Sequence, residues 1–397
     1  MRLAQRLSRV APSATLTLAA KAKAMKAEGQ DVVSLTAGEP DFPTAPHIIA
    51  AIHRSLDRGD TTYTAVPGVP ELREAVAAHH SRDEVPFAAE NVIVSTGAKQ
   101  SLFGAMQCLL DPGDKGVVIA PYWLSYADMI RVAGGEVEIV QTDESSDFLA
   151  APDRLDAALA GARVLVLNSP SNPSGALYSA DRMNEIAGVL RKHPDVVIIA
   201  DEIYDRFVYG DASYTSILDV APDLAERILL INGCSKTYAM TGLRIGWAVG
   251  PKPLIGAMSR LQGQSTSNAS APMQAGALAA ITGDQTPVEE MVRAFDVRRK
   301  FVVGRLQAIP GVTCFEPAGA FYVLPSLASY VGRTLPDGSP IDDTFPITAH
   351  LLHDHGLVVV PGGPFGAPNH IRLSFAADME NLTKGLDRLR DALVAFS

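Results

Sequence analysis

The stretch "VVIIADEIY" at residues 196–204 begins with apolar, mostly β-branched residues and ends in polar ones. An apolar run of this length without alternation is typical of a strand that is buried on both faces, as in a mainly parallel sheet covered by helices. Asp201 closes the run, and Tyr204 follows three residues later. Because ligands of open α/β sheets bind beyond the carboxyl ends of the strands, Asp201 is expected to lie at a ligand-binding site.

The same pattern recurs along the middle of the chain, where short apolar runs alternate with turns and helical stretches. The other strand candidates are residues 91–95, 116–120, 136–140, 164–168, 228–232 and 246–250. In the helical stretch at 179–193, Ser179 is a suitable N-cap, and apolar residues recur on one face at spacings of three and four. We predict an α/β fold with about seven strands in a mainly parallel sheet flanked by helices.

The rhythm changes after about residue 285, where a charged helix is followed by short apolar runs, a Gly/Pro/Asp-rich stretch and a final helix. This pattern favours a smaller α+β unit. A chain of 397 residues also exceeds the ~250 to 300 residues at which single cores stop growing. We predict a large ligand-binding domain at 46–284 and a small domain formed by 285–397 together with an N-terminal arm, 1–45.

Composition and charge restrict the possible partners. A formal charge of -10 and a pI near 5.4 argue against broad binding to nucleic acid or anionic membranes, which leaves small molecules as the expected partners. Cys108, Cys234 and Cys314 are too few and too far apart for a disulfide framework or a cysteine metal site. The sequence shows neither a signal-type apolar segment nor a membrane-spanning run. We therefore expect a cytoplasmic protein.

Three further segments follow strand candidates and bear chemically useful groups. "TGAKQ" at 96–100 places Gly97 and Ala98 at a helix start, whose free N–H groups can bind a phosphate. "SPSNPSG" at 169–175 contains Asn172, and "NGCSKTYAMTGLRIG" at 232–246 contains Lys236. Taken singly, such residues are more often caps, Asx-turn residues or surface charges. Their coincidence at one sheet edge favours a functional site.

Together these groups suit one kind of cofactor, an aromatic aldehyde with a pyridine nitrogen and a phosphate. Such a cofactor needs an amine to bind the aldehyde, a carboxylate to keep the ring nitrogen protonated, and a phosphate cup. Lys236 supplies the amine and Asp201 the carboxylate. The cup would be formed by Gly97, Ala98, Ser235 and Arg244, and the planar guanidinium suits phosphate oxygens. Trp123 could stack on the ring, although a single Trp in an apolar run is more often a core residue.

Ten blocks of the sequence, in order, resemble the class I aminotransferases of pyridoxal-phosphate fold type I. The likeness is closest to the short subgroup of bacterial aspartate aminotransferases, some of which also use prephenate. The blocks are residues 34–44, 63–76, 95–103, 120–129, 168–179, 201–209, 233–247, 319–325, 358–366 and 371–376. They span nearly the whole chain and are specific at the level of the family.

The resemblance implies the cofactor pyridoxal 5'-phosphate and a role for each residue around it. Lys236 would bind the cofactor covalently and later move the substrate proton, and Asp201 would pair with the pyridinium nitrogen. Tyr204 and Asn172 would bind the ring oxygen, and Trp123 would stack on the ring. The phosphate contacts would come from Gly97, Ala98, Ser235, Arg244 and, from the neighbouring subunit, Tyr63. A homodimer with shared active sites is therefore implied.

The resemblance also implies how a substrate is bound. Arg372 would hold the α-carboxylate, assisted by Asn172, Trp123 and the backbone of Gly38. Lys99, Ser13 and Thr15 stand where the short subgroup binds a distal carboxylate, which favours a dicarboxylic substrate. Two cations would then bracket the two carboxylates. The expected reaction is ping-pong transfer of an amino group between aspartate or glutamate and 2-oxoglutarate or oxaloacetate.

Other functions remain open within and outside the cofactor class. Prephenate, aromatic or other amino-acid aminotransferases are alternatives, and so is a β-lyase on the same fold. A transcription regulator with an aminotransferase-like domain would need an added winged-helix module, whereas 33 residues precede "SLTAGEPDF". Departures from the family pattern are Leu243, Phe375, Ser174 and the loop "GGPFG" at 362–366. Phe375 and this loop are expected near the substrate, so the preferred donor stays open.

Two other conspicuous clusters are interpreted as structural. "HLLHDHG" groups His350, His353 and His355, and histidines three residues apart can share a metal. The segment lies far from the other candidate site residues in the family layout, so we expect the exposed side of a helix without a metal. "RRK" at 298–300 is expected to be a solvated helix face.

Overall fold

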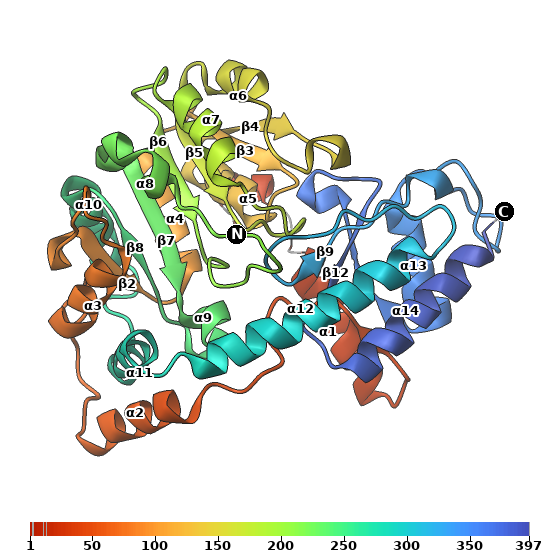
Figure 1. Ribbon diagram of the computed structural model, residues 1–397, viewed down its shortest axis with the longest axis horizontal. Helices are drawn as coiled ribbons and strands as arrows, with labels where there is room; N and C mark the ends of the chain where they lie inside the picture. The colour runs from red at the N-terminus through yellow and green to blue at the C-terminus, as the bar shows by residue number, and fades with distance from the viewer. Residues whose placement is uncertain (2–3, 11, 13, 397) are drawn as a thin grey trace.

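The computed structural model describes residues 1, 4–10, 12 and 14–396, with a seven-stranded sheet at the centre of its larger part (Figure 1). The strand order is β2-β8-β7-β6-β5-β3-β4, and each strand matches a predicted apolar run. Their bounds are β2 Val92–Ser95, β3 Lys115–Ala120, β4 Glu136–Gln141, β5 Ala162–Asn168, β6 Val197–Asp201, β7 Ile228–Gly233 and β8 Gly246–Val249. The predicted mainly parallel α/β sheet is thus confirmed, with β8 antiparallel to both its neighbours.

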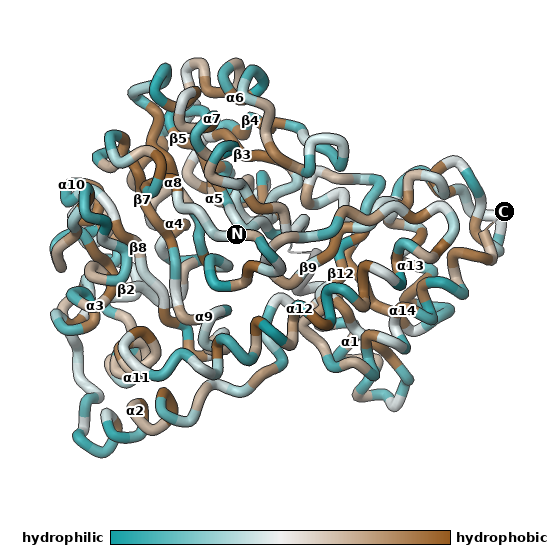
Figure 2. Tube along the Cα trace, in the orientation of Figure 1, coloured by the Kyte–Doolittle hydropathy of each residue, from teal (hydrophilic) through white to brown (hydrophobic). Residues whose placement is uncertain are grey.

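Helices cover both faces of this sheet, and the central strands are mainly apolar for that reason (Figure 2), whereas the edge strand β4 carries the exposed residues Glu136 and Gln141. In β6, Ile198 and Ala200 pack into one apolar cluster, whereas Ile199 between them packs into another on the opposite face. The second face is covered by α4, α5 and α10 and the first by most of the others. The helices are α2 Pro46–Asp57, α3 Pro70–His80, α4 Ala98–Leu109, α5 Ser125–Ala133, α6 Pro152–Leu159, α7 Ala180–Leu190, α8 Ile217–Val220, α9 Cys234–Thr237, α10 Lys252–Gly263 and α11 Ala271–Thr282.

The predicted helix after residue 179 illustrates how local sequence fixes an element. Helix α7 begins directly after Ser179, whose hydroxyl accepts a hydrogen bond from the backbone N–H of Arg182. Met183, Ile186 and Leu190 are buried on its inner face. The N-cap therefore fixes where α7 begins, and the apolar stripe fixes which face is buried, as the sequence predicted.

The smaller part combines two short sheets with long helices at the other end of the molecule (Figure 1). One sheet has the order β11-β12-β9, and the other pairs β1 with β10 in parallel. The elements are α1 Ala14–Ala27, β1 Val33–Ser34, α12 Thr286–Gln307, β9 Tyr322–Val323, α13 Thr344–His355, β10 Leu357–Val358, β11 Val360–Pro361, β12 Ile371–Ser374 and α14 Met379–Val394. The predicted division of the chain at residues 46 and 285 stays a prediction.

Seven short 3-10 helices accompany these elements in the described part of the chain. They are η1 Gln5–Arg9, η2 Ala89–Asn91, η3 Glu144–Ser146, η4 Pro222–Arg227, η5 Thr241–Leu243, η6 Ala328–Tyr330 and η7 Gly363–Phe365. Of these, η5 lies closest in sequence to the candidate site.

The "RRK" segment of α12 differs from its prediction. Arg299 is only 6% exposed and forms ion pairs with Asp296 at 2.8 Å and Glu316 at 2.6 Å. Arg298 pairs with Asp41 at 2.6 Å. The prediction of a solvated face is therefore wrong for both arginines, because distant carboxylates fold onto this side of the helix. Lys300 is exposed, as expected.

A buried pair of carboxyl groups lies behind the end of β6. Glu202 accepts a 2.5 Å hydrogen bond from the Ser216 hydroxyl, and Asp205 accepts one of 2.9 Å from the side chain of Asn232. One carboxyl oxygen of Asp205 is buried without a hydrogen-bond partner. Burial raises the pKa of Glu202 to about 7 and that of Asp205 to about 6, because the charged forms lose their hydration.

This pair predicts a stability that falls with pH. A carboxyl group whose pKa is raised on folding contributes stability below its ordinary pKa, and that contribution is lost as the pH rises through about 7 for Glu202. Glu202→Gln, which keeps an acceptor for Ser216, should therefore raise the free energy of unfolding at pH 8 by on the order of 2 to 3 kcal/mol. The gain should vanish near pH 5 in denaturant titrations. The exposed control Glu90→Gln should show no such trend, and equal destabilisation by Glu202→Gln at both pH values would contradict this account.

Candidate active site

A cavity of about 650 Å³ lies at the carboxyl edge of the large sheet. Its wall includes side chains from the sheet edge, from the segment after β1, from α1 and from β12. Eleven of the predicted site residues line it, although they are far apart in the sequence. They are Gly38, Ala98, Lys99, Trp123, Asn172, Asp201, Tyr204, Ser235, Lys236, Arg244 and Arg372.

Four other predicted residues are placed differently. Gly97 is the N-cap of α4, beside the wall but not part of it. Tyr63 is 88% exposed and lies away from the cavity wall, so its contact with a neighbouring subunit stays a prediction. Ser13 is outside the described residues, and Thr15 belongs to α1 but its side chain is outside the described part.

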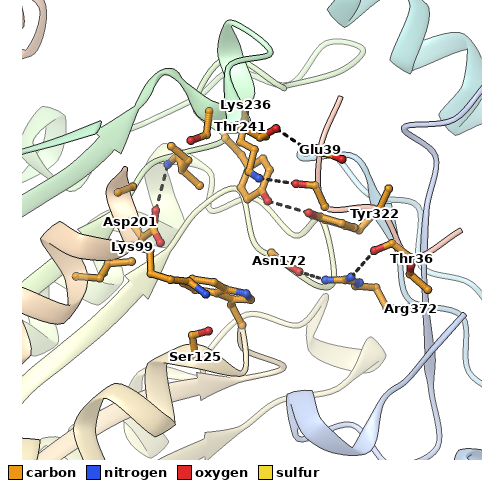
Figure 3. Close-up of a pocket in the computed structure, with 18 of the residues that line it drawn as sticks. Thr36, Glu39, Lys99, Ser125, Asn172, Asp201, Lys236, Thr241, Tyr322 and Arg372 are labelled. Atoms are coloured by element: carbon orange, nitrogen blue, oxygen red, sulfur yellow. Dashed lines mark hydrogen bonds between the residues drawn. The ribbon is translucent and has the colours of Figure 1, made fainter. Parts of the chain in front are cut away.

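Lys236 lies on the short helix α9, directly after β7, and its amine points into the cavity (Figure 3). The amine donates a hydrogen bond to the backbone carbonyl of Gly38. Burial lowers the pKa of Lys236 to about 8, while the carboxylate of Glu39 acts in the opposite direction. An amine with a pKa this close to neutral is partly uncharged at physiological pH, which makes it available as a nucleophile or a base.

Asp201 is the last residue of β6 and is 3% exposed. Its carboxylate accepts a 2.6 Å hydrogen bond from the Tyr126 hydroxyl and a 3.3 Å bond from the backbone N–H of Ile203. Burial raises the pKa of Asp201 to about 6, against the effect of these hydrogen bonds. The group is thus ionised near neutral pH in a buried position, where a cationic partner would stabilise it strongly.

The start of α4 and the side chain of Arg244 lie side by side at one corner of the cavity. Gly97 has a φ of +82°, and a Cβ at this position would lie 2.6 Å from an Nη atom of Arg244. Glycine therefore allows the guanidinium to approach the first turn of the helix. Arg244 donates a 2.8 Å hydrogen bond to the carbonyl of Thr241. A helix N-terminus beside a guanidinium is suited to a phosphate group.

Arg372, on β12, is 2% exposed and faces the cavity from the side opposite Lys99 and Asp201 (Figure 3). Its Nη atoms donate to the side-chain oxygen of Asn172 at 2.9 Å and to the carbonyl of Thr36 at 3.1 Å. Its Nε has no hydrogen-bond partner, and burial lowers the pKa of the guanidinium. A buried cation with only neutral acceptors is prepared for an external carboxylate.

Sequence reasoning missed several residues that line the cavity, among them Tyr126, Tyr322, Thr241 and Glu39. Tyr126 holds Asp201, and Tyr322 shares a 2.9 Å hydrogen bond with the hydroxyl of Tyr204. The hydroxyl of Thr241 donates to Glu39 at 2.6 Å. Tyr126 and Tyr322 lie inside blocks that carry the family resemblance, so their tyrosine identity was an available signal. No local signal linked Thr241 with Glu39.

Trp123 and Lys99 form one wall together. The amine of Lys99 lies 4.6 Å from the centre of the Trp123 ring. Burial lowers the pKa of Lys99, and the charge of Arg244 lowers it further. Trp123 also contacts Tyr126 edge to face, with ring centres 5.3 Å apart. The indole is thus part of the cavity wall rather than the interior core.

The departures from the family pattern occupy different places. Phe375 is fully buried against Tyr209 and Phe295 and does not line the cavity, so its expected place near the substrate is wrong. In the loop at 362–366, the ring centre of Phe365 lies 5.0 Å from the guanidinium carbon of Arg372. Leu243 packs against the apolar cluster of the large sheet. Phe375 therefore belongs to the small core, whereas the loop supports Arg372.

The histidine cluster of α13 forms ordinary side-chain contacts. His350 pairs with Asp354 at 2.7 Å, and the ring centres of His350 and His355 are 5.1 Å apart. His350 is half-buried against Phe396, so it is less exposed than expected. Within the described residues, no three His, Cys, Asp or Glu side chains are placed to hold a metal ion. No helix of that part has both the length and the apolar character to cross a bilayer.

Comparison with known proteins finds relatives that match this chain over nearly its full length. An aspartate aminotransferase of Streptomyces avermitilis is 43% identical, with 99% of this chain and 96% of that protein covered. The solved aspartate aminotransferase of Rhizobium meliloti has a TM-score of 0.96 at 40% identity and covers both chains completely. The Thermus thermophilus enzyme, solved with maleate, has a TM-score of 0.92 at 39% identity over 99% of this chain and 100% of that one. The family model "Aminotransferase class I and II" matches residues 30–389, and the chain belongs to this family.

Proposed function

We propose that this protein transfers an amino group between an L-amino acid and a 2-oxoacid with pyridoxal 5'-phosphate, and that its preferred substrates are dicarboxylic. The observation that carries the proposal is the buried amine of Lys236, which lines one cavity with Asp201 and Arg372. Aspartate and glutamate with oxaloacetate and 2-oxoglutarate are the expected pairs. The reaction is a ping-pong exchange in which a second oxoacid reverses the steps of the first half.

The residues present fit this cofactor. Gly97 lets the guanidinium of Arg244 lie against the start of α4, where a phosphate would bind, Trp123 offers a flat apolar wall, and Asp201 offers a buried carboxylate for a protonated ring nitrogen. Ser235, 7% exposed on α9, would add a hydroxyl to the phosphate contacts, and Asn172 and Tyr204 would face the ring oxygen. When bound, the cofactor withdraws electrons from the substrate Cα.

The protein's own groups then perform the remaining tasks. Arg372 binds and orients the substrate α-carboxylate, with the fork geometry that matches two oxygens. Lys236, whose pKa of about 8 keeps a fraction of the amine uncharged, removes the proton from the substrate Cα. Tyr126 fixes the carboxylate of Asp201 by its 2.6 Å hydrogen bond. With its carboxylate held by Arg372, the substrate would present its Cα–H bond to the amine of Lys236.

Lys99 is the proposed partner of the distal carboxylate. It lines the cavity across from Arg372 (Figure 3), and the maleate bound to the Thermus thermophilus relative is itself a dicarboxylate. Lys99→Ala should lower kcat/KM for aspartate by about tenfold or more, since a charge-assisted contact is lost, and leave alanine and phenylalanine unaffected. Steady-state assays should show normal rates for the exposed control Lys192→Ala. Unchanged aspartate turnover in Lys99→Ala would reject the assignment.

Two further parts of the proposal concern assembly and alternatives. Tyr63, 88% exposed, is proposed to reach the cofactor phosphate of a second subunit, so a homodimer is expected in solution. Prephenate is the next candidate substrate, since one relative at 42% identity, from Rhizobium leguminosarum bv. phaseoli, is named a probable aspartate/prephenate aminotransferase. A β-lyase would release ammonia and oxoacid without an acceptor, whereas the proposed transferase requires the acceptor for turnover.

A further inference from the structure

Helix α1 brings two lysines to the cavity that the roles proposed above do not use. Lys23 and Lys26 stand three residues apart, so they share one face of the helix, and both line the cavity. Both side chains are exposed. Neither has an ion-pair or hydrogen-bond partner in the described part of the chain, as neither occurs in any of its salt bridges or side-chain hydrogen bonds.

The orientation of α1 is set by its other faces. Ala22, Leu18 and Met25 form a small apolar cluster with residues of the smaller part of the molecule, among them Leu352. On that side, Lys21 lies 3.2 Å from a ring nitrogen of His353. Since the helix is docked by these contacts, Lys23 and Lys26 are held on the side of the cavity.

The charges around the cavity show what remains for these lysines to bind. Among the described residues, six cationic side chains line it, against the two carboxylates of Glu39 and Asp201; the cations are Lys23, Lys26, Lys99, Lys236, Arg244 and Arg372. Glu39 is already bonded to Thr241, and Asp201 is buried and bonded to Tyr126. The cofactor phosphate and one substrate carboxylate would occupy Arg244 and Arg372. The surplus of positive charge therefore lies with the lysines, two of which are on α1.

We propose that Lys23 and Lys26 form an entrance subsite that attracts and first binds the distal carboxylate of dicarboxylic substrates. The inference rests on the proposed function and adds a second group of cations to Lys99. Exposed charges at the mouth of a cavity raise the local concentration of anions and the rate of association. The effect of the two lysines should therefore appear in kcat/KM and should increase with the negative charge of the substrate. It should decrease as salt is added, because salt screens the attraction over a Debye length of about 8 to 10 Å.

The test uses the holoenzyme and the double variant Lys23→Gln/Lys26→Gln, which removes charge but keeps helix-forming side chains. At low salt, kcat/KM for 2-oxoglutarate should fall about three- to tenfold, with kcat unchanged and a flatter dependence on ionic strength. 2-Oxobutyrate, which lacks the distal carboxylate, should change less than about twofold. The control Lys21→Gln, on the same helix but directed to His353, should behave as the wild type for both acceptors.

A binding measurement separates this inference from the proposed reaction. Trp123 lines the cavity, whereas Trp247 is buried in the large core, so the fluorescence change on adding an unreactive acid reports the site. The dissociation constant of succinate should rise three- to tenfold in the double variant, and that of butyrate should stay constant. Wild-type succinate binding in the double variant, or an equal loss in Lys21→Gln, would overturn the inference. If succinate behaves as expected while no transamination occurs, the proposed function fails and the subsite stands.

Discussion

Replacement of Lys236 by alanine is expected to abolish amino-group transfer, lowering kcat by at least about 10³-fold. The amine is the buried nucleophile of the cavity, with a pKa lowered to about 8 by burial. No other amine of the described residues is comparably buried there, since Lys23, Lys26 and Lys99 are all exposed. The variant should also fail to develop the absorbance of a covalently held cofactor when pyridoxal 5'-phosphate is added.

Folding provides the control for this experiment. Burial disfavours the charged form of Lys236, so its loss should leave the melting temperature at pH 7 unchanged or raise it. The exposed variant Lys192→Ala should keep full activity. A Lys236→Ala protein that is folded, binds the cofactor covalently and turns over aspartate would show that another group performs the chemistry.

Replacement of Arg372 by lysine is the second change with a large expected effect. Lysine keeps the positive charge but not the planar fork, and it cannot bond Asn172 and Thr36 together with two carboxylate oxygens. We expect kcat/KM to fall by about 10²- to 10³-fold, which corresponds to roughly 3 to 4 kcal/mol. The loss should be equal for aspartate, alanine and phenylalanine, because the α-carboxylate is common to all.

This uniform loss distinguishes Arg372 from the lysines of the cavity. Lys99→Ala and the α1 double variant should affect dicarboxylic substrates selectively, whereas Arg372→Lys should not discriminate. Arg333→Lys, an exposed arginine in the smaller part of the molecule, serves as the matched control and should be silent. A deficit confined to dicarboxylic substrates in Arg372→Lys would place the distal carboxylate, rather than the α-carboxylate, at this residue.

The large sheet was predictable because most of its strands are apolar on both faces. Ile198 and Ile199 are adjacent and face opposite helical layers. A continuous apolar run such as that of β6 is therefore what a strand buried on both faces requires. The direction of β8 was not predictable in the same way. Its pairing with β2 and β7 is antiparallel, and a run such as residues 246–250 is the same whichever way the strand points.

Much of the candidate site was predictable from residues that follow strands, with the family resemblance supplying their roles. Asn168 pairs with Asp201 in register between β5 and β6, so the segments after these strands meet at one edge of the sheet. Contacts between distant segments were not predictable. Arg372 reaches Asn172 across 200 positions of the chain, and Lys236 reaches Gly38 across 198.

The wrong predictions share one physical cause. Arg299 looked solvated because its neighbours in the sequence are charged, but Glu316 supplies a carboxylate from another segment. Phe375 was expected near the substrate, yet it packs against Phe295 in the small core. In both cases, the burial of the side chain is decided by residues of other segments. Neither the charge of the neighbouring residues nor the place in a family motif predicts those contacts.

The central claim is that Lys236 holds the cofactor. The most direct measurement is to load the purified protein with pyridoxal 5'-phosphate, reduce the linkage with borohydride, digest the protein and locate the added mass by peptide sequencing in a mass spectrometer. The account predicts one modified lysine per chain, Lys236, on the peptide that follows β7. Modification at Lys99, Lys23 or Lys26 instead, or no stable adduct at all, would contradict it.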